Sequence, residues 1–371
     1  MLVDLAKRFG GADVRVLRLA AELGAHRPCV VATIEGSALQ ARLESTGQPH
    51  LVVRRRRGDP RVALDLARAL RRGRYEVVDA QNPQSQLWAL AAGLIARMPV
   101  RVTTVHSQYL AEHGGSRRGR AYEAVLRLNR IAGSRFIAVS DATLAYVRSL
   151  GVPPARVALI PNAVPAAVPD PAGRGAVLGS WPADAYVVGV VARLEPVKGV
   201  ADLIDAVALA RAHEPRLRLL VVGDGRARDE LEARARDAGL GDAVRFPGFR
   251  DDVGTLMSGL DALCLPSHSE GLPFALLEAC AHGLPLVVSR VGGMDLLLED
   301  GLPALGVPPQ DPPALAAALR ALAEDPASAA EMGARARAMV GERFSVERMV
   351  EATLRAYGGR VTPATAGASP S

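Results

Sequence analysis

Short apolar runs alternate with longer segments of helical periodicity along almost the whole chain. In the first half these runs predict strands at 29–34, 50–53, 76–80, 100–106 and 135–139. In the second half the same pattern predicts strands at 186–193, 217–223, 244–247, 262–266 and 286–289. Such alternation is typical of parallel sheets covered by helices, so we expect an α/β protein in which each half forms a Rossmann-like domain.

The length of 371 residues also favours two domains, since it exceeds what one hydrophobic core usually supports. Segment 159–175 is rich in Pro, Ala and Gly and predicts a linker, with a ligand cleft between the domains. We therefore expect domains at 1–165 and 166–344, then a helix at 345–357 and a disordered tail at 358–371. The start at 2–4 leaves little room for a first strand, so that strand is very short or the true start lies upstream.

Composition places the protein among globular chains. The apolar fraction is 49%, with no long uncharged apolar run and no secretory leader, so we expect a cytoplasmic protein. The three cysteines are too few and too scattered for a disulfide framework, and we expect them to be buried and reduced.

Charge is unevenly distributed. Residues 1–169 hold 25 Lys and Arg against 12 Asp and Glu, whereas 170–371 hold 20 against 27, so the halves carry +13 and −7. The basic half, with Arg clusters at 54–57, 71–74 and 117–120, fits an anionic partner such as a membrane surface, a nucleic acid or a phosphorylated substrate. Since 43 of the 45 cations are Arg, each cluster fits an ordinary solvated face as well.

Ligands of open parallel sheets bind beyond the carboxyl ends of the strands, which makes the strand exits the places to inspect. At the first exit of the second half, Arg193 and Lys198 flank a helix expected to begin near Gly199. Two cations beside the unpaired N–H groups of a helix start suit a diphosphate. Lys198 is one of only two lysines, although a surface lysine at a helix start would look the same.

A second exit, at 267–280, places Glu270 and Glu278 eight positions apart around a predicted helix start. Pro273 fits the first helical position and Gly283 fits the end of the helix. Both carboxylates would then be available to accept hydrogen bonds from hydroxyl groups. Taken alone, the segment fits two surface glutamates equally well.

Weaker signals follow other strands. Gly223 and Gly225 would let a ligand approach the backbone closely, and the segment 247–250, with Phe249, would lie beside a base. Segment 289–293 adds a glycine-rich exit. In the first half, Gly10 and Gly11 precede a helix expected at 14–23, and His106 ends a strand. We expect structural roles for the remaining notable histidines, which are His26, His113 and His213.

Taken in order, these segments resemble glycosyltransferase family 4, a retaining family with the GT-B architecture of two Rossmann-like domains facing a cleft. The resemblance runs from about Phe9 to Tyr357, nearly the whole chain. Glu270 and Glu278 match the family's Glu, seven residues, Glu signature. The matching segments are 10–13, 104–106, 137–140, 160–164, the pair 193 and 198, 222–225 and 270–278.

The resemblance implies a role for each matching residue. Catalytic roles fall to His106 beside the reacting sugar, to Arg193 and Lys198 on the leaving diphosphate, and to Glu270 on the donor-sugar hydroxyls. Glu278 would hold the ribose. The implied donor-binding set is Gly11, Arg193, Lys198, Gly223, Phe249, Glu270, Gly271, Leu272, Pro273 and Glu278. The first domain would bind the acceptor, the second the donor, and helix 345–357 would cross back to the first domain.

The implied activity is retaining transfer of a sugar from a nucleotide diphosphate sugar to an acceptor hydroxyl. No D-x-D motif occurs, so we expect activity without a metal or other cofactor. The acceptor would be a glycan, a lipid-linked or anionic molecule or a small molecule, with peripheral contact to the inner membrane face through the basic half and no nucleic acid. A GT-B epimerase and a non-catalytic nucleotide-sugar-binding protein remain alternatives. An NAD-dependent oxidoreductase does not, because no G-x-G-x-x-G turn occurs.

Overall fold

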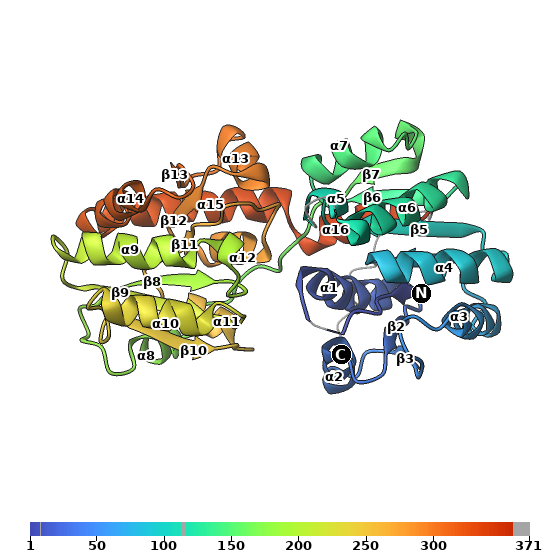
Figure 1. Cartoon of the computed structure of the whole chain (residues 1–371), viewed down its shortest axis with the longest axis horizontal. Coiled ribbons are helices and arrows are strands. Elements are labelled where there is room, and N and C mark those ends of the chain that lie inside the picture. Colours follow the sequence, from blue (N-terminus) through green and yellow to red (C-terminus); the bar gives the residue numbers. More distant parts are fainter. Residues whose placement is uncertain (8, 113–115, 359–371) are drawn as a thin grey trace, which may run out of the picture. The chain divides into compact units, whose positions relative to one another are not determined.

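The computed structural model describes residues 1–7, 9–112 and 116–358; the side chains of 25, 26, 111 and 112 are not described. The chain divides into two compact units, which we call unit 1 (Met1–Ala163 and Val346 onward) and unit 2 (Val164–Ser345). Each unit has its own parallel sheet (Figure 1). The predicted tail beyond Gly358 and His113 lie outside the described residues, and the cleft between the domains stays a prediction.

Unit 1 contains a seven-stranded sheet in the order β3-β2-β1-β4-β5-β6-β7, with every pair parallel. The strands are β1 (Leu2–Val3), β2 (Val31–Ile34), β3 (His50–Val53), β4 (Val77–Ala80), β5 (Val100–Val105), β6 (Arg135–Ala138) and β7 (Val157–Leu159). The five predicted strands are confirmed. The central strand β1 has only two residues, and β7, with three, was not predicted because so short a run carries no periodicity.

The helices of unit 1 cover both faces of this sheet. They are α1 (Gly11–His26), α2 (Ala38–Ser45), α3 (Arg61–Arg72), α4 (Pro83–Ala96), α5 (Tyr109–Glu112), α6 (Arg117–Ile131), α7 (Asp141–Ser149), the 3-10 turn η1 (Pro154–Arg156) and α16 (Val346–Ala356). Helix α1 is longer than the predicted 14–23. It begins at Gly11 because the buried carboxylate of Asp13 accepts a hydrogen bond from the Gly10 amide, at 2.8 Å.

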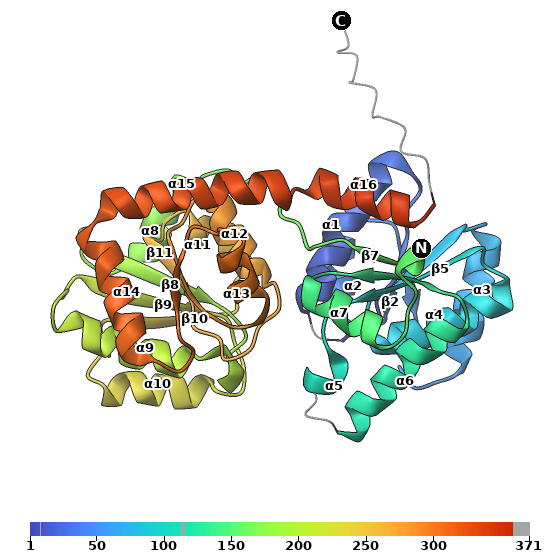
Figure 2. The same ribbon diagram turned by 90° about the horizontal axis from the view of Figure 1, so that it is seen from above.

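Helix α16 lies beside α1 although the two are far apart in the sequence (Figure 2). Its buried face, with Met349 and Val350, joins the apolar cluster formed by Val16 and Leu19 of α1. The last segment of the chain thus completes the core of unit 1.

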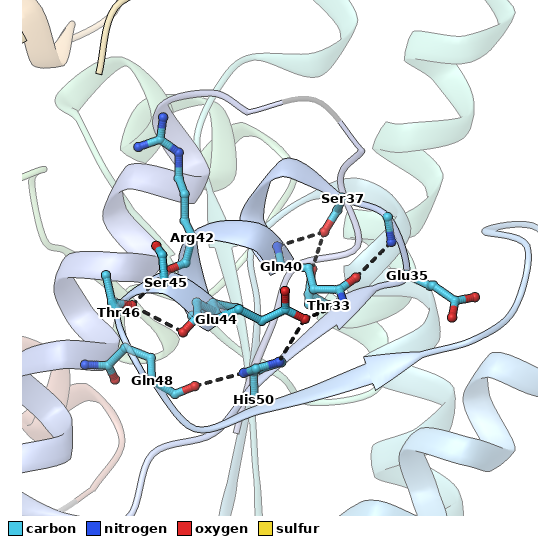
Figure 3. Close-up of polar contacts among 12 residues, drawn as sticks. Thr33, Glu35, Ser37, Gln40, Arg42, Glu44, Ser45, Thr46, Gln48 and His50 are labelled. Atoms are coloured by element: carbon cyan, nitrogen blue, oxygen red, sulfur yellow. Dashed lines mark hydrogen bonds and ion pairs between the residues drawn. The ribbon is translucent and has the colours of Figure 1, made fainter. Parts of the chain in front are cut away.

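Local capping explains the short helix α2, whose surroundings are drawn in Figure 3. Ser37 accepts a hydrogen bond from the Gln40 amide at 3.1 Å, and its hydroxyl lies 2.9 Å from that of Thr33 at the end of β2. Gln40 donates to Glu44 one turn later, at 2.7 Å. A serine cap stabilises a helix by about 1 kcal/mol, so the turn after β2 is well defined.

Unit 2 contains a six-stranded parallel sheet in the order β10-β9-β8-β11-β12-β13. The strands are β8 (Tyr186–Val191), β9 (Leu217–Val222), β10 (Val244–Gly248), β11 (Ala262–Leu265), β12 (Leu286–Ser289) and β13 (Leu305–Val307). The five predicted strands are confirmed, and the three-residue β13 was missed. Strand β8 ends at Val191, so the predicted end at Arg193 is wrong and that residue belongs to the following loop.

Two apolar clusters cover the two faces of this sheet. Consecutive residues of β8, such as Val187 and Val188, belong to different clusters. Successive side chains of a strand point to opposite faces, so this is the pattern expected of a sheet buried on both sides. The helical elements are α8 (Gly173–Leu178), η2 (Pro196–Lys198), α9 (Val200–Arg211), α10 (Arg228–Asp237), α11 (Val253–Met257), α12 (Phe274–His282), α13 (Gly292–Glu299), α14 (Pro312–Glu324) and α15 (Pro326–Arg343).

Two local expectations need correction. Pro273 precedes α12 instead of opening it, because its ψ of 140° is extended and the first helical residue is Phe274. Cys264 and Cys280 are buried free cysteines, as expected, whereas Cys29 is only partly buried.

Candidate active site

A direct polar contact joins two of the predicted site residues, Lys198 and Glu270. Lys198 Nζ donates to Glu270 Oε2, and the two side chains are 16% and 15% exposed. The Ser267 hydroxyl donates to the same carboxylate oxygen, at 3.2 Å. Because the pair is largely shielded from water, the attraction between its charges is stronger than on an open surface. The predicted diphosphate cation and the predicted sugar-binding carboxylate are therefore partners in this structure.

A glycine allows the loops that carry this pair to pack closely together. Gly199 lies between η2 and α9 with φ of +66°, and a Cβ there would overlap the carbonyl oxygen of Pro266 at the exit of β11. The His268 amide donates to the Val197 carbonyl at 2.8 Å, and His268 Nε2 lies 2.6 Å from Asp202 Oδ2 in the first turn of α9. The exits of β8 and β11 thus form one fixed surface.

The Gly223 turn has a different role from the one expected of it. Its φ is +135°, and a Cβ would overlap the carbonyl oxygen of Ala192; at Gly225 a Cβ would overlap that of Leu194. The Leu194 amide also donates to the Asp224 carbonyl, at 2.9 Å. These two glycines allow the exits of β8 and β9 to approach each other, an approach that leaves no room for a ligand at those Cβ positions.

Arg193 lies on the loop that these contacts hold. Its side chain is exposed and, within the described ranges, enters no hydrogen bond or ion pair. A guanidinium held on a fixed loop with its donors unengaged is suited to an anionic ligand.

The weak segment at 289–293 supports the Glu270 loop. Gly292 has φ of +50°, and a Cβ on it would overlap the carbonyl oxygen of Glu270; Gly293 is similarly close to the carbonyl of Gly271 and donates its amide to Glu270 at 3.2 Å. The sequence drew attention to this strand exit without indicating a role. Its Gly-Gly pair lets the start of α13 pack directly under the predicted sugar-binding loop.

The other predicted residues of unit 2 lie around the same strand ends. Leu272 and Pro273 lead into α12, and Pro273 makes no side-chain cap at the start of that helix. Glu278 follows one turn into α12 and is partly buried. Phe249, just after β10, is 58% exposed, so an aromatic face is presented beyond this edge of the sheet.

In unit 1 the predicted catalytic histidine is held in a polar interior. His106 follows β5, is partly buried, and its Nε2 lies 3.1 Å from Gln81 Oε1. Burial, and then the charge of Arg15, lower the pKa of His106 to about 3, so the ring is neutral near pH 7. Gly11, the exposed first residue of α1, is the other predicted site residue of this unit.

Sequence reasoning missed the buried polar residues behind His106. Asp79 is 1% exposed and accepts hydrogen bonds from the hydroxyls of Thr104, at 2.8 Å, and Tyr357, at 2.6 Å. Arg15 is also buried, donates to the Pro161 carbonyl at 2.9 Å, and has Nε and one Nη without a partner among the described residues. An aspartate inside the apolar strand β4 is the one signal in the sequence that could have revealed this cluster.

The predicted site residues therefore fall into two sets. The unit 2 set lies at the carboxyl ends of β8 to β11, with Lys198 and Glu270 in direct contact. The unit 1 set, His106 and Gly11, lies beyond the carboxyl end of β5 and at the start of α1.

Comparison with known proteins identifies the family. The model of "Glycosyltransferase Family 4" matches residues 9–168, and that of "Glycosyl transferases group 1" matches residues 179–339. The glycogen synthase of Mycobacterium tuberculosis is 31% identical over 294 residues, covering 76% of this chain and 69% of that relative. The chain belongs to glycosyltransferase family 4. The resemblance inferred from the motifs is thereby confirmed.

Two further comparisons are informative. A D-inositol 3-phosphate glycosyltransferase of Kineococcus radiotolerans is 37% identical over 249 residues, covering 61% of this chain and 57% of that relative. The crystal structure of HepE from Anabaena in complex with UDP and glucose matches with a TM-score of 0.82 and 25% identity, covering 96% of this chain and 98% of HepE. The GT-B fold class is confirmed, and this family 4 member is a glycosyltransferase.

Proposed function

We propose that this glycosyltransferase moves a sugar from a nucleotide diphosphate donor to an acceptor hydroxyl, with retention of configuration and without a metal. The observation that carries the proposal is the shielded Lys198–Glu270 pair on the loop surface that also presents Arg193. Unit 2 would bind the donor and unit 1 the acceptor.

The pair suggests how the donor is recognised. Lys198 has Glu270 as its counter-ion. The diphosphate of the donor would replace Glu270 as the partner of Lys198 and would also bind Arg193. Glu270 would then be free to accept hydrogen bonds from hydroxyl groups of the sugar. In the observed pairing each charge is the counter-ion of the other, which limits the penalty of shielding both from water, and after the exchange hydroxyl hydrogen bonds would satisfy the Glu270 carboxylate.

The same groups would supply the main stabilisation of the transition state. Negative charge grows on the diphosphate as the sugar leaves, and Lys198 and Arg193 are placed to stabilise it before the acceptor hydroxyl attacks from the same face. Two full positive charges here would replace the divalent metal of other transferases. Neutral His106 would accept a hydrogen bond beside the reacting sugar.

The remaining predicted residues would complete donor binding. Glu278 would hold the ribose, and the exposed ring of Phe249 would lie against the base. The backbone at Gly271, Leu272 and Pro273, just before α12, together with Gly11 of α1, would approach the phosphates and the sugar. Gly223 would contribute by holding the Arg193 loop in place.

A uridine nucleotide is the first donor to test. HepE, a structural neighbour at 25% identity, has been solved with UDP, with UDP and glucose, and with UDP-glucose. We propose a UDP-sugar as the donor on this basis.

For the acceptor we propose a lipid-linked or otherwise anionic molecule, bound by a cytoplasmic enzyme in peripheral contact with the inner membrane face. Across the described ranges no helix is long and apolar enough to cross a membrane. The basic clusters differ in what they offer: Arg55 and Arg61 already pair with Asp59, whereas Arg72 and Arg74 are exposed at the end of α3. Salt-sensitive sedimentation with anionic vesicles is expected; sedimentation that is absent, or unaffected by Arg72→Ser/Arg74→Ser, would contradict it.

Thermal shift with UDP, GDP, ADP and their sugar conjugates tests the donor site. A ligand at about 100 times its Kd stabilises a protein by about 2.7 kcal/mol. One nucleotide series is expected to raise Tm, and the rise is expected to vanish in Lys198→Ala. The matched control is Arg216→Ala, which breaks another Lys/Arg–Glu pair, with Glu214, just before β9 at the opposite end of the strands. No shift with any nucleotide from folded protein would overturn the proposal.

A further inference from the structure

A continuous line of hydrogen bonds runs through the interior of unit 1 to His106. It begins at Tyr357, whose hydroxyl donates to Asp79 Oδ2 at 2.6 Å. The Thr104 hydroxyl donates to Asp79 Oδ1 at 2.8 Å and accepts from Gln81 Nε2 at 3.4 Å. Gln81 Oε1 faces His106 Nε2 at 3.1 Å. Asp79, Gln81 and Thr104 are each at most 1% exposed, so water does not compete for these bonds.

The order of donors and acceptors along this line is fixed. A carboxylate accepts hydrogen bonds, so the Thr104 proton points to Asp79 and the Thr104 oxygen is left to accept. Only the NH₂ group of the Gln81 amide can donate to that oxygen, which turns the amide oxygen toward His106. An amide oxygen cannot donate, so the proton on the neutral imidazole must be on Nε2.

We propose that Asp79, Thr104 and Gln81 are positioning residues that hold His106 as the Nε2–H tautomer and so leave Nδ1 as a hydrogen-bond acceptor. Within the described ranges Nδ1 has no hydrogen-bond partner, so it is available to a hydroxyl group. This inference rests on the proposed role of His106 beside the reacting sugar.

Tyr357 ties the line to the C-terminal helix. It directly follows α16, and 278 positions separate it from Asp79 in the sequence. Burial raises the pKa of Asp79, while the bonds from Tyr357 and Thr104 and the charge of Arg15 favour its ionised form. Docking of α16 therefore supplies a donor to Asp79 that favours its ionised, accepting form.

The test reads the tautomer directly. Protein labelled with ¹⁵N-histidine is examined near pH 7 by long-range ¹H–¹⁵N correlation, and the His106 signals are identified by their loss in His106→Gln. Wild type is expected to show Nε2 protonated and Nδ1 unprotonated. In Thr104→Val, which removes both bonds of that hydroxyl, the Nδ1–H form is expected to appear, and kcat with UDP-glucose to fall about tenfold with KM within about threefold.

The matched control is Thr103→Val. Thr103 is the neighbour of Thr104 on β5, is equally buried, and donates to Asn129 at 2.9 Å outside the line. It is expected to lose similar stability with the tautomer unchanged. Tyr357→Phe, with Tyr146→Phe as its control, gives a milder second variant, expected to shift the tautomer partly.

Two results would overturn the inference: an Nδ1–H tautomer in wild type, or a pure Nε2–H tautomer in both Thr104→Val and Tyr357→Phe. Absence of any nucleotide-sugar turnover would count against the proposed function instead. The tautomer measurement needs no substrate, so the two failures are distinguishable.

Discussion

Two arginines show how the candidate regions of the two units differ. Arg193 of unit 2 is exposed on a loop held by glycines, with its donors unengaged in the described structure. Arg15 of unit 1 is 1% exposed among Asp79, His106 and Tyr357, and burial lowers its pKa to about 10. The first can bind a ligand; the second sets the electrostatic environment of neighbouring groups. On the proposed function, Arg193 would act in recognition of the donor, whereas Arg15 and the buried polar groups around it would set the state of His106.

The largest effect is expected at the charges on the loop surface of unit 2. Lys198→Ala should lower kcat/KM by about 10²- to 10³-fold with the fold intact, because it removes a charge aimed at the leaving diphosphate. Steady-state kinetics with circular dichroism as a check on folding would measure it, with Arg216→Ala as the control. A value within about threefold of wild type would show that the unit 2 region is not the source of catalysis.

Glu270→Gln separates the two partners of the ion pair. The variant keeps the size of the side chain but frees Lys198 from its counter-ion, so UDP should bind at least as tightly as to wild type. Turnover should fall about 10²-fold, because a neutral amide oxygen accepts hydroxyl hydrogen bonds from the sugar more weakly than a carboxylate does. Calorimetry with UDP alongside kinetics measures both. Weaker UDP binding would refute the exchange of partners.

Two glycine-to-alanine variants test whether the position of the Glu270 loop depends on its close packing against Gly292. Gly292→Ala and Gly301→Ala both place a side chain at positive φ, but only Gly292 has a carbonyl oxygen, that of Glu270, at the Cβ position. Gly301→Ala should lose about 1 kcal/mol of stability with unchanged activity. Gly292→Ala should lose more stability and about tenfold in kcat/KM, since the Glu270 loop must move. Equal behaviour of the two variants in denaturant unfolding and kinetics would contradict this.

The smallest effect is expected from the pH dependence of unit 1. The pKa of His106 is about 3 in the folded chain against 6.5 when unperturbed, so between these values only the unfolded state binds the proton. Stability contributed by His106 is therefore lost as pH falls from 6.5. His106→Gln should become more stable relative to wild type by up to about 1.4 kcal/mol per pH unit in that window. Denaturant unfolding at pH 5.0 and 7.0 measures it, and a pH-independent difference would show that the ring has the same pKa in the folded and unfolded chains, as a solvated histidine does.

The difference between the units also decides what the sequence could reveal. Strands long enough to show periodicity were found in both halves, whereas β1, β7 and β13, of two or three residues, were too short. Lys198 and Glu270 were placed at the same sheet edge because each follows a strand of a parallel sheet. Their pairing depends on loop contacts through Gly199, which no pattern encodes.

The buried contacts of unit 1 could not be predicted from the sequence for a related reason. Tyr357 and Asp79 meet only because α16 packs on α1, and a contact across 278 positions leaves no local signature. An aspartate in a buried strand signals that a partner exists without saying which one.

The central claim is tested most directly by release of UDP from UDP-glucose in the presence of excess EDTA, comparing wild type with Lys198→Ala and Arg216→Ala. Metal-free transfer driven by unit 2 charges predicts turnover that EDTA leaves unchanged, that Lys198→Ala lowers by at least 10²-fold, and that Arg216→Ala preserves. Turnover abolished by EDTA and restored by a divalent metal, or insensitive to the loss of Lys198, would contradict it.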